Sequence, residues 1–153
     1  MRKSVFIGGI LTYTALIYAI LLGSALVGFV DLNTVLLMLT LPCAFLLQAH
    51  GLNGLRTVKK AAGHWGGSQE FPPNEIQDAI CVVESGAKGT LSSAWLCMLI
   101  GAIQMLQHVT SENIDGIGPA VGVMLLSYFY ARIMNQVFWH PMERWLRQQS
   151  LGN

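Results

Sequence analysis

The sequence predicts an all-α integral membrane protein with four transmembrane helices and a short cytoplasmic amphipathic helix. The first observation is composition: 53% of the 153 residues are hydrophobic and 11% are charged, whereas about a quarter of the residues of a soluble domain are charged. The second is the length of the uncharged apolar runs, because a helix needs about 20 such residues to cross about 30 Å of hydrocarbon. We therefore treat residues 1–153 as one membrane domain.

The first two predicted spans are residues 5–30 and 33–49. Residues 5–30 contain no charged side chain, and Asp31 separates them from the second run. The second run is shorter and contains Pro42, which a membrane helix tolerates where neighbouring helices or hydroxyls satisfy the freed carbonyl. The basic start of the chain is typical of a signal peptide, but the apolar run is too long for one and no small-residue cleavage site clearly follows it. We expect a retained first helix.

A polar loop, residues 50–90, follows the second span. Within it Asn74 is a predicted helix cap, and the apolar residues after it recur at spacings of three and four, which is typical of an amphipathic helix. Gly86 and Gly89 are predicted to end this helix before the third span begins. The loop also carries a cytoplasmic basic face formed by Arg56, Lys59 and Lys60.

The third and fourth predicted spans are residues 91–109 and 117–139, joined by a short loop, and residues 140–153 form a tail that returns to water. Apart from Arg132, neither span contains a lysine, arginine, aspartate or glutamate. Hydroxyl side chains occur inside the spans, but they bond back to their own helix and are weak signals of function.

The distribution of basic residues predicts the orientation. Of the nine lysines and arginines, all except Arg132 lie before the first span, in the polar loop or in the tail. Because short cytoplasmic segments carry the excess of these residues, both termini are predicted to be cytoplasmic. Trp139 and Trp145 are then expected to be interfacial aromatics at the inner end of the fourth span.

Arg132 has two interpretations. Its guanidinium can snorkel to the inner interface, which lies about two helical turns away near Trp139. Alternatively, it is a cation held against an acidic group on a neighbouring subunit or a partner helix. Since the four spans contain no aspartate or glutamate, an ion pathway through this chain needs a carboxylate from another polypeptide.

Several classes of function are not supported. A net charge of +1 with scattered basic residues argues against a nucleic-acid partner. The cysteines are odd in number and show no CxxC or Cys/His spacing, so neither a disulfide framework nor a zinc site is expected. No nucleotide-binding loop, nucleophile elbow or HExxH helix is present, and we expect neither an enzyme nor a cofactor.

The order of these parts and several short motifs carry a resemblance to a known family. The motifs are Gly28-Phe29-Val30-Asp31, Ser85-Gly86-Ala87-Lys88-Gly89, Ile117-Gly118-Pro119-Ala120, Leu125-Leu126-Ser127, Tyr130 and Val137-Phe138-Trp139-His140-Pro141-Met142. Together they resemble the MotA branch of the MotA/TolQ/ExbB proton-channel family, with a shortened cytoplasmic region. The resemblance covers nearly the whole chain.

The resemblance implies a homopentamer in the bacterial inner membrane. Five copies would enclose the helices of two copies of a MotB/ExbD/TolR-like single-span partner, whose aspartate carries a proton or sodium ion. In such assemblies hydroxyls of the third and fourth helices face that aspartate, and Ser127 matches one of these positions. The implied ion-pathway or partner-facing residues are Ser127, Tyr128, Met98, Pro119 and Arg132.

This sequence departs from the family pattern at several of these positions. Met98 stands where the third helix usually has a threonine, Tyr128 replaces a second hydroxyl residue, and Arg132 stands where a small residue is usual. The large cytoplasmic insertion with which motor members engage a flagellar rotor is missing. Two hypotheses follow: an ion-driven stator or energiser channel subunit, and a non-conducting membrane scaffold or regulatory subunit of the same fold. An unrelated transporter or membrane enzyme is a third, for which Pro42 and Pro119 are the only hints.

Overall fold

The computed structural model describes residues 14, 18, 32–67, 70–108 and 117–152, and its elements are all helical. They are helix α2 (Leu32–Gly66), the 3-10 turn η2 (Pro73–Glu75), helix α3 (Ile76–His108), helix α4 (Ile117–Met134), the π-helical turn η4 (Asn135–Trp139) and helix α5 (His140–Gly152). Apart from Thr14 and Tyr18, the predicted first span, residues 5–30, lies outside the described residues, and so does the predicted loop between the third and fourth spans.

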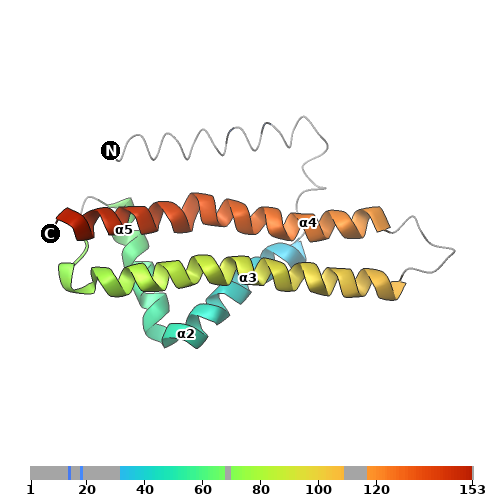
Figure 1. Ribbon diagram of the computed structural model, residues 1–153, viewed down its shortest axis with the longest axis horizontal. Coiled ribbons are helices and arrows are strands. Elements are labelled where there is room, and N and C mark those ends of the chain that lie inside the picture. Colours follow the sequence, from blue (N-terminus) through green and yellow to red (C-terminus); the bar gives the residue numbers. More distant parts are fainter. Residues whose placement is uncertain (1–13, 15–17, 19–31, 68–69, 109–116, 153) are drawn as a thin grey trace.

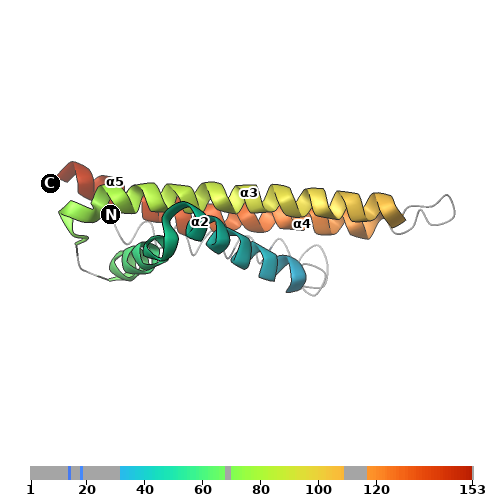
Figure 2. The same ribbon diagram turned by 90° about the horizontal axis from the view of Figure 1, so that it is seen from below.

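Two long antiparallel rods form the frame of the molecule. One rod is α3, and the other is the continuous succession of α4, η4 and α5, which lies beside α3 along its length (Figures 1 and 2). At about 1.5 Å per residue each rod is about 50 Å long. Two contacts set their register: Gly101 faces Met124, and Asn135 Nδ2 donates a hydrogen bond of 3.3 Å to the carbonyl oxygen of Ala87.

The unbroken course of α3 corrects one prediction. Gly86 and Gly89, expected to end a short amphipathic helix, lie in the interior of α3. The reason is packing with distant residues: a Cβ at Gly86 would lie 2.5 Å from Cη2 of Trp139, and one at Gly89 would lie 3.2 Å from Cβ of Phe45. Glycine costs a helix about 0.5–1 kcal/mol relative to alanine, but here it admits a tryptophan and a phenylalanine ring.

A break at Gly51 divides α2 into two segments. Gly51 has φ 61° and ψ −161°, a backbone conformation that is essentially restricted to glycine. The segment before the break contains the predicted second span, 33–49, whereas the segment after it, 52–66, crosses α3 and α5 (Figure 1). The polar loop predicted for residues 50–90 is therefore largely helical. Its apolar side chains explain this difference, because they pack on the core: Leu55, Val58, Ala61, Ala62 and Trp65.

Trp139 also differs from its prediction as an interfacial aromatic. Its side chain is 3% exposed, and its Nε1 donates a hydrogen bond of 2.9 Å to Thr90 Oγ1. The indole is held inside the protein because it fills the space beside Gly86 and finds a buried acceptor for its N–H group. Trp145 is half-buried and lies edge-on to Phe71.

The described residues form two halves whose surfaces differ in polarity. We define the apolar half as residues 34–49, 91–108 and 117–134, and the charged half as residues 50–67, 70–90 and 135–152. Among the described residues, Arg132 is the only lysine, arginine, aspartate or glutamate in the apolar half. Most exposed large hydrophobic side chains lie in that half: Leu36, Leu37, Leu39, Leu47, Trp95, Leu96, Leu99, Ile100, Ile103, Leu106, Val121, Leu125 and Tyr128.

The charged half has the inverse arrangement, with its apolar residues inside. Its core cluster includes Phe71, Val83, Trp139, Met142 and Leu146, all at most 3% exposed. Within the described residues, the stretches Thr34–Gly66 and Pro73–Gln107 are helices long and apolar enough to cross a membrane.

Candidate functional site

The exposed residues of α4 form one continuous stripe. They recur every three or four positions, and a helix with 3.6 residues per turn places such positions on one face. We call these residues the α4 stripe: Gly118, Val121, Gly122, Leu125, Tyr128 and Arg132.

The α4 stripe differs in chemistry from the exposed face of α3. The large exposed side chains of α3 in the apolar half are tryptophan, leucine and isoleucine, whereas the stripe combines Val121 and Leu125 with two glycines, a phenol and a guanidinium. A Cβ placed on Gly118 or Gly122 would meet nothing within 4 Å, so both glycines border open space. Small residues let the backbones of two membrane helices approach closely. The stripe is therefore the better candidate for contact with another helix, and the α3 face is the better candidate for contact with lipid.

The guanidinium of Arg132 lies over the ring of Tyr128, with 5.9 Å between the guanidinium carbon and the ring centroid. Tyr128 is one helical turn closer to the start of α4 than Arg132. The charge is thus directed away from the charged half, as the tilt of helical side chains toward the N-terminus favours. Snorkelling to the charged half requires the opposite direction.

Ser127 lies on the other side of α4 from the stripe. Its side chain is 2% exposed and shares a buried face with Ala131, four residues further on. Ala131 packs with Ala94 and Cys97 of α3 and with Met38 of α2. Of the two hydroxyl residues predicted to face a partner, Tyr128 is at the surface, being 38% exposed, and Ser127 is inside the chain's own packing.

The other predicted site residues are dispersed. Met98 is half-buried on α3, and Pro119 lies in the first turn of α4. On α2, Arg56 and Lys59 are exposed, but Lys60 forms an ion pair with Glu75 and its ammonium lies 5.5 Å from the ring centroid of Phe71. The structure therefore leaves Arg56 and Lys59 as the accessible charges of the predicted basic face.

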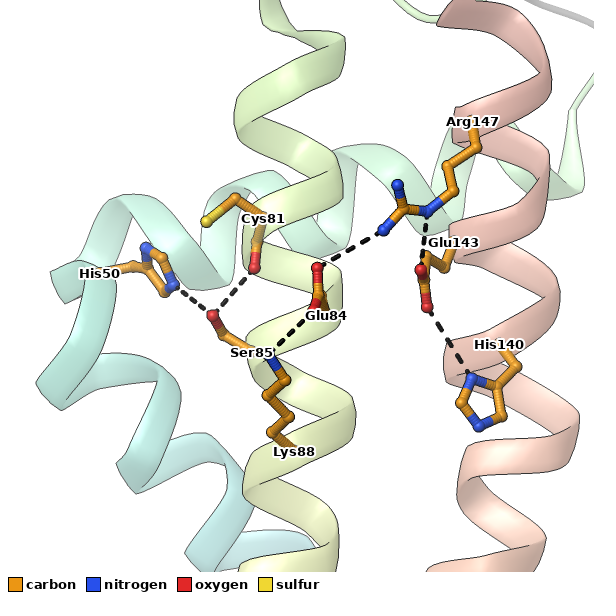
Figure 3. Close-up of polar contacts among 8 residues, drawn as sticks. All are labelled: His50, Cys81, Glu84, Ser85, Lys88, His140, Glu143 and Arg147. Atoms are coloured by element: carbon orange, nitrogen blue, oxygen red, sulfur yellow. Dashed lines mark hydrogen bonds and ion pairs between the residues drawn. The ribbon is translucent and has the colours of Figure 1, made fainter.

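A chain of ion pairs joins α3 to α5 in the charged half (Figure 3). Lys88 Nζ is 2.8 Å from Glu84 Oε1, and Arg147 contacts Glu84 at 3.5 Å and Glu143 at 2.8 Å. His140 Nδ1 lies 3.8 Å from Glu143. The hydrogen bond from Lys88, together with its charge, lowers the pKa of Glu84, and the hydrogen bond to Glu143 raises the pKa of Arg147.

His50 and Ser85 form a contact that the sequence did not predict, because they are far apart in the chain. His50 Nε2 lies 2.9 Å from Ser85 Oγ, and Ser85 donates its hydroxyl proton to the carbonyl oxygen of Cys81 at 2.9 Å (Figure 3). A hydroxyl has one proton to donate, so when Ser85 gives its proton to Cys81 it accepts from the Nε2–H tautomer of His50. A cavity of about 240 Å³ beside the pair is lined by His50, Asn53, Gly54, Thr57, Asp78, Cys81 and Val82.

Within the described part of the chain, no group of three or more histidine, cysteine, aspartate or glutamate residues is placed to hold a metal ion. Over the described residues, the geometry defines a helical protein in which two helices are long and apolar enough to cross a membrane and α4 has an exposed face of mixed polarity. No protein-family model and no curated protein sequence matches this chain.

Proposed function

We propose that this protein is the channel-forming subunit of an ion-driven membrane complex of the MotA/TolQ/ExbB type. In this proposal four spans cross the bacterial inner membrane, both termini are cytoplasmic, and five copies surround a single-span partner that carries an aspartate. The observation that carries the proposal is the α4 stripe, an exposed helix face on which two glycines, a phenol and a guanidinium lie beside Val121 and Leu125.

The distribution of side chains supports the placement in a membrane. Exposed aliphatic residues gather in the apolar half and ionised residues gather in the charged half, and an apolar surface of this extent is unusual on a protein surrounded by water. The part of α3 in the apolar half, residues 91–108, is about 27 Å long, close to the hydrocarbon thickness of about 30 Å. The rest of α3 would extend into the cytoplasm.

The absence of a carboxylate from the described apolar half supports a division of labour with a partner. Movement of a proton or sodium ion through a membrane requires an ionisable or coordinating group at depth. A partner helix lying on the α4 stripe would bring its carboxylate next to the phenol of Tyr128, while Ser127, on the buried face, would stabilise the packing of α4.

Counting subunits tests this proposal directly. The protein is extracted from its native membranes in a mild detergent and studied by native mass spectrometry and cryo-microscopy. We expect five copies around two additional helices. A monomer, a dimer or another even-numbered assembly would contradict the proposal.

A second candidate function, a non-conducting scaffold of the same fold, is favoured by the direction of Arg132. A guanidinium held over Tyr128 places a fixed positive charge beside the proposed pathway, and such a charge raises the barrier for a passing cation. Proton flux into proteoliposomes that contain the purified complex separates the two candidates. Proton flux through the wild type that Tyr128→Phe blocks would support the conducting subunit. If the wild type shows no flux and Arg132→Ala shows flux, the result would support the non-conducting scaffold.

A further inference from the structure

We propose that the segment of α2 after the break, residues 52–66, lies along the membrane surface and binds the headgroups of anionic phospholipids through Arg56 and Lys59. The inference rests on the membrane placement in the proposed function. It requires neither an ion pathway nor a particular number of subunits.

The two ends of this segment lie at nearly the same level of the molecule. At its start, His50 Nε2 is 2.9 Å from Ser85 Oγ, and Ser85 lies about 9 Å along α3 from the apolar half. At its end, the ring of Trp65 is 6.3 Å from the ring of Phe138, which lies about 6 Å along its rod from the apolar half. The headgroup layer of a bilayer extends about 5–8 Å beyond the hydrocarbon on each side. The segment therefore follows the headgroup layer, and Figure 1 shows it crossing the rods.

The exposed face of the segment combines a large apolar side chain with two cations. Leu52 is 67% exposed, and the exposed residues Arg56 and Lys59 follow it by four and seven positions, which places all three on one face. The neighbouring Lys60 pairs with Glu75, whereas no carboxylate among the described residues lies within 4.0 Å of Arg56 or Lys59. An apolar side chain beside basic ones is typical of a helix that lies in a membrane interface.

The fold holds this face in position before any lipid binds. The positive φ of Gly51 lets the chain turn directly from the predicted second span into the segment. The opposite face of the segment packs on the core of the charged half through Leu55, Val58 and Trp65. Because the helix is already ordered, binding a headgroup costs only the freedom of the two long side chains.

An anionic lipid fits this face better than an acidic protein does. Headgroups surround a membrane protein at this level, and the flexible stems of arginine and lysine let their charges reach the phosphates. Leu52, at the start of the segment next to the span, would contact the boundary of the acyl chains, whereas an acidic surface would offer it no apolar contact. Each lysine or arginine near an anionic membrane surface strengthens the association about fivefold.

The test measures binding of phosphatidylglycerol and of phosphatidylcholine to the full chain in a mild nonionic detergent, by native mass spectrometry. We expect the wild type to prefer phosphatidylglycerol and Arg56→Gln and Lys59→Gln each to lower this preference about fivefold. Arg56→Lys should retain it, because the charge is kept. The matched control is Arg144→Gln, which removes one exposed cation from α5 and should leave the preference unchanged. High salt should weaken the preference in the wild type.

Four results would overturn the inference. Two are equal binding of both lipids by the wild type and an equal loss of preference in Arg144→Gln, which would assign the effect to net charge. The third is displacement of phosphatidylglycerol by soluble glycerol phosphate, which would define a site for a free anion. The fourth is its displacement by an oligoglutamate peptide, which would favour an acidic protein.

The same spectra keep this inference separate from the proposed function, because they also report the number of subunits. A preference for phosphatidylglycerol in a dimer would contradict the pentamer and leave the lipid-binding face standing. A pentamer without the preference would do the reverse.

Discussion

Trp139 occupies the space that a side chain at position 86 would need. Three ring carbons of Trp139 lie 2.5–2.9 Å from the position of a Cβ on Gly86, closer than van der Waals contact allows. Because the indole is 3% exposed and bonded to Thr90, it has little freedom to move away. The contact therefore makes Gly86 a packing requirement of the charged half.

Gly86→Ala is expected to destabilise the protein by about 1–3 kcal/mol, the cost of forcing an extra methyl group into a packed core. The measurement is the thermal unfolding midpoint in detergent. Gly63→Ala is the matched control, because Gly63 lies in a helix with nothing within 4 Å of an added Cβ. There alanine should raise stability by about 0.5–1 kcal/mol. Equal effects of the two substitutions would show that Trp139 moves freely.

At the scale of the helices, the break in α2 also depends on glycine residues. Gly51 adopts a positive φ that a residue with a Cβ rarely takes, and Gly54, one turn later, has His50 Cβ 2.6 Å from the position of an added Cβ. These two glycines let α2 change direction and bring His50 to Ser85.

Gly51→Ala is predicted to cost about 1–3 kcal/mol, the strain of a residue other than glycine in this region. Hydrogen exchange of the segment after the break, read by mass spectrometry, reports the change, and residues 52–66 should exchange faster. Gly66→Ala at the end of α2, with open space around it, should leave the exchange of this segment unchanged. An unaltered pattern in Gly51→Ala would contradict the assigned strain.

The ion-pair chain between α3 and α5 predicts a dependence of stability on pH. The pKa of Glu84 is lowered from its ordinary value of 4.5 by Lys88 and Arg147. At pH values between the folded pKa of Glu84 and 4.5, the unfolded state binds more protons than the folded state, so stability rises with pH. The contribution of Glu84 to folding stability is therefore complete above pH 4.5 and is lost as the pH falls through its folded pKa. Glu84→Gln should lower stability near pH 7 and flatten the acid limb of the profile.

The check is to measure thermal unfolding midpoints of the wild type and the variant at about ten pH values between about pH 2.5 and pH 7. Glu70→Gln serves as the control, because Glu70 is exposed and forms no ion pair with the described residues. Its profile should follow the wild type. A Glu84→Gln profile parallel to the wild type would show that the pairs in Figure 3 contribute nothing to folding.

Periodicity and composition predicted the helices, and contacts between distant residues decided where they begin and end. The apolar runs 33–49, 91–109 and 117–139 are helical over their described residues, because hydrophobicity is a local property of the sequence. The fusion of the amphipathic helix with the third span was missed, since it depends on Trp139 filling the space beside Gly86.

The sequence names candidate residues on the fourth helix, and the structure adds which of them lie on its exposed face. Ser127 and Tyr128 are adjacent in sequence, and about 100° of helical rotation separates their side chains, so one is buried and the other exposed. The family resemblance marked both as partner-facing. The stripe itself became visible only when the buried face of α4 was known.

Chemical labelling of the protein's own cysteines tests whether the apolar half lies in the membrane and the charged half in water. Cys43, in the apolar half, and Cys81, in the charged half, are both exposed, whereas Cys97 is buried. A water-soluble maleimide needs a thiolate in contact with water. In inverted membrane vesicles that carry single-cysteine variants, we expect Cys81 to react and Cys43 and Cys97 to remain unlabelled.

Right-side-out vesicles provide the control for this labelling. There the membrane-impermeant maleimide should not reach Cys81, because the charged half is proposed to be cytoplasmic. Labelling of Cys43 at the rate of Cys81 would contradict the membrane placement. Labelling of Cys81 from the outside would reverse the proposed orientation.

The unbroken helix α3 gives the protein a mechanical property. The rod is about 50 Å long, with one end among apolar side chains and the other among charged ones. A tilt of about 5° about its apolar end displaces its charged end by about 4 Å, which follows from its length. The ion pairs to Arg147 and the contact between Ser85 and His50 couple that displacement to α5 and α2. A tilt of α3 would therefore shift the parts of α5 and α2 that these contacts join.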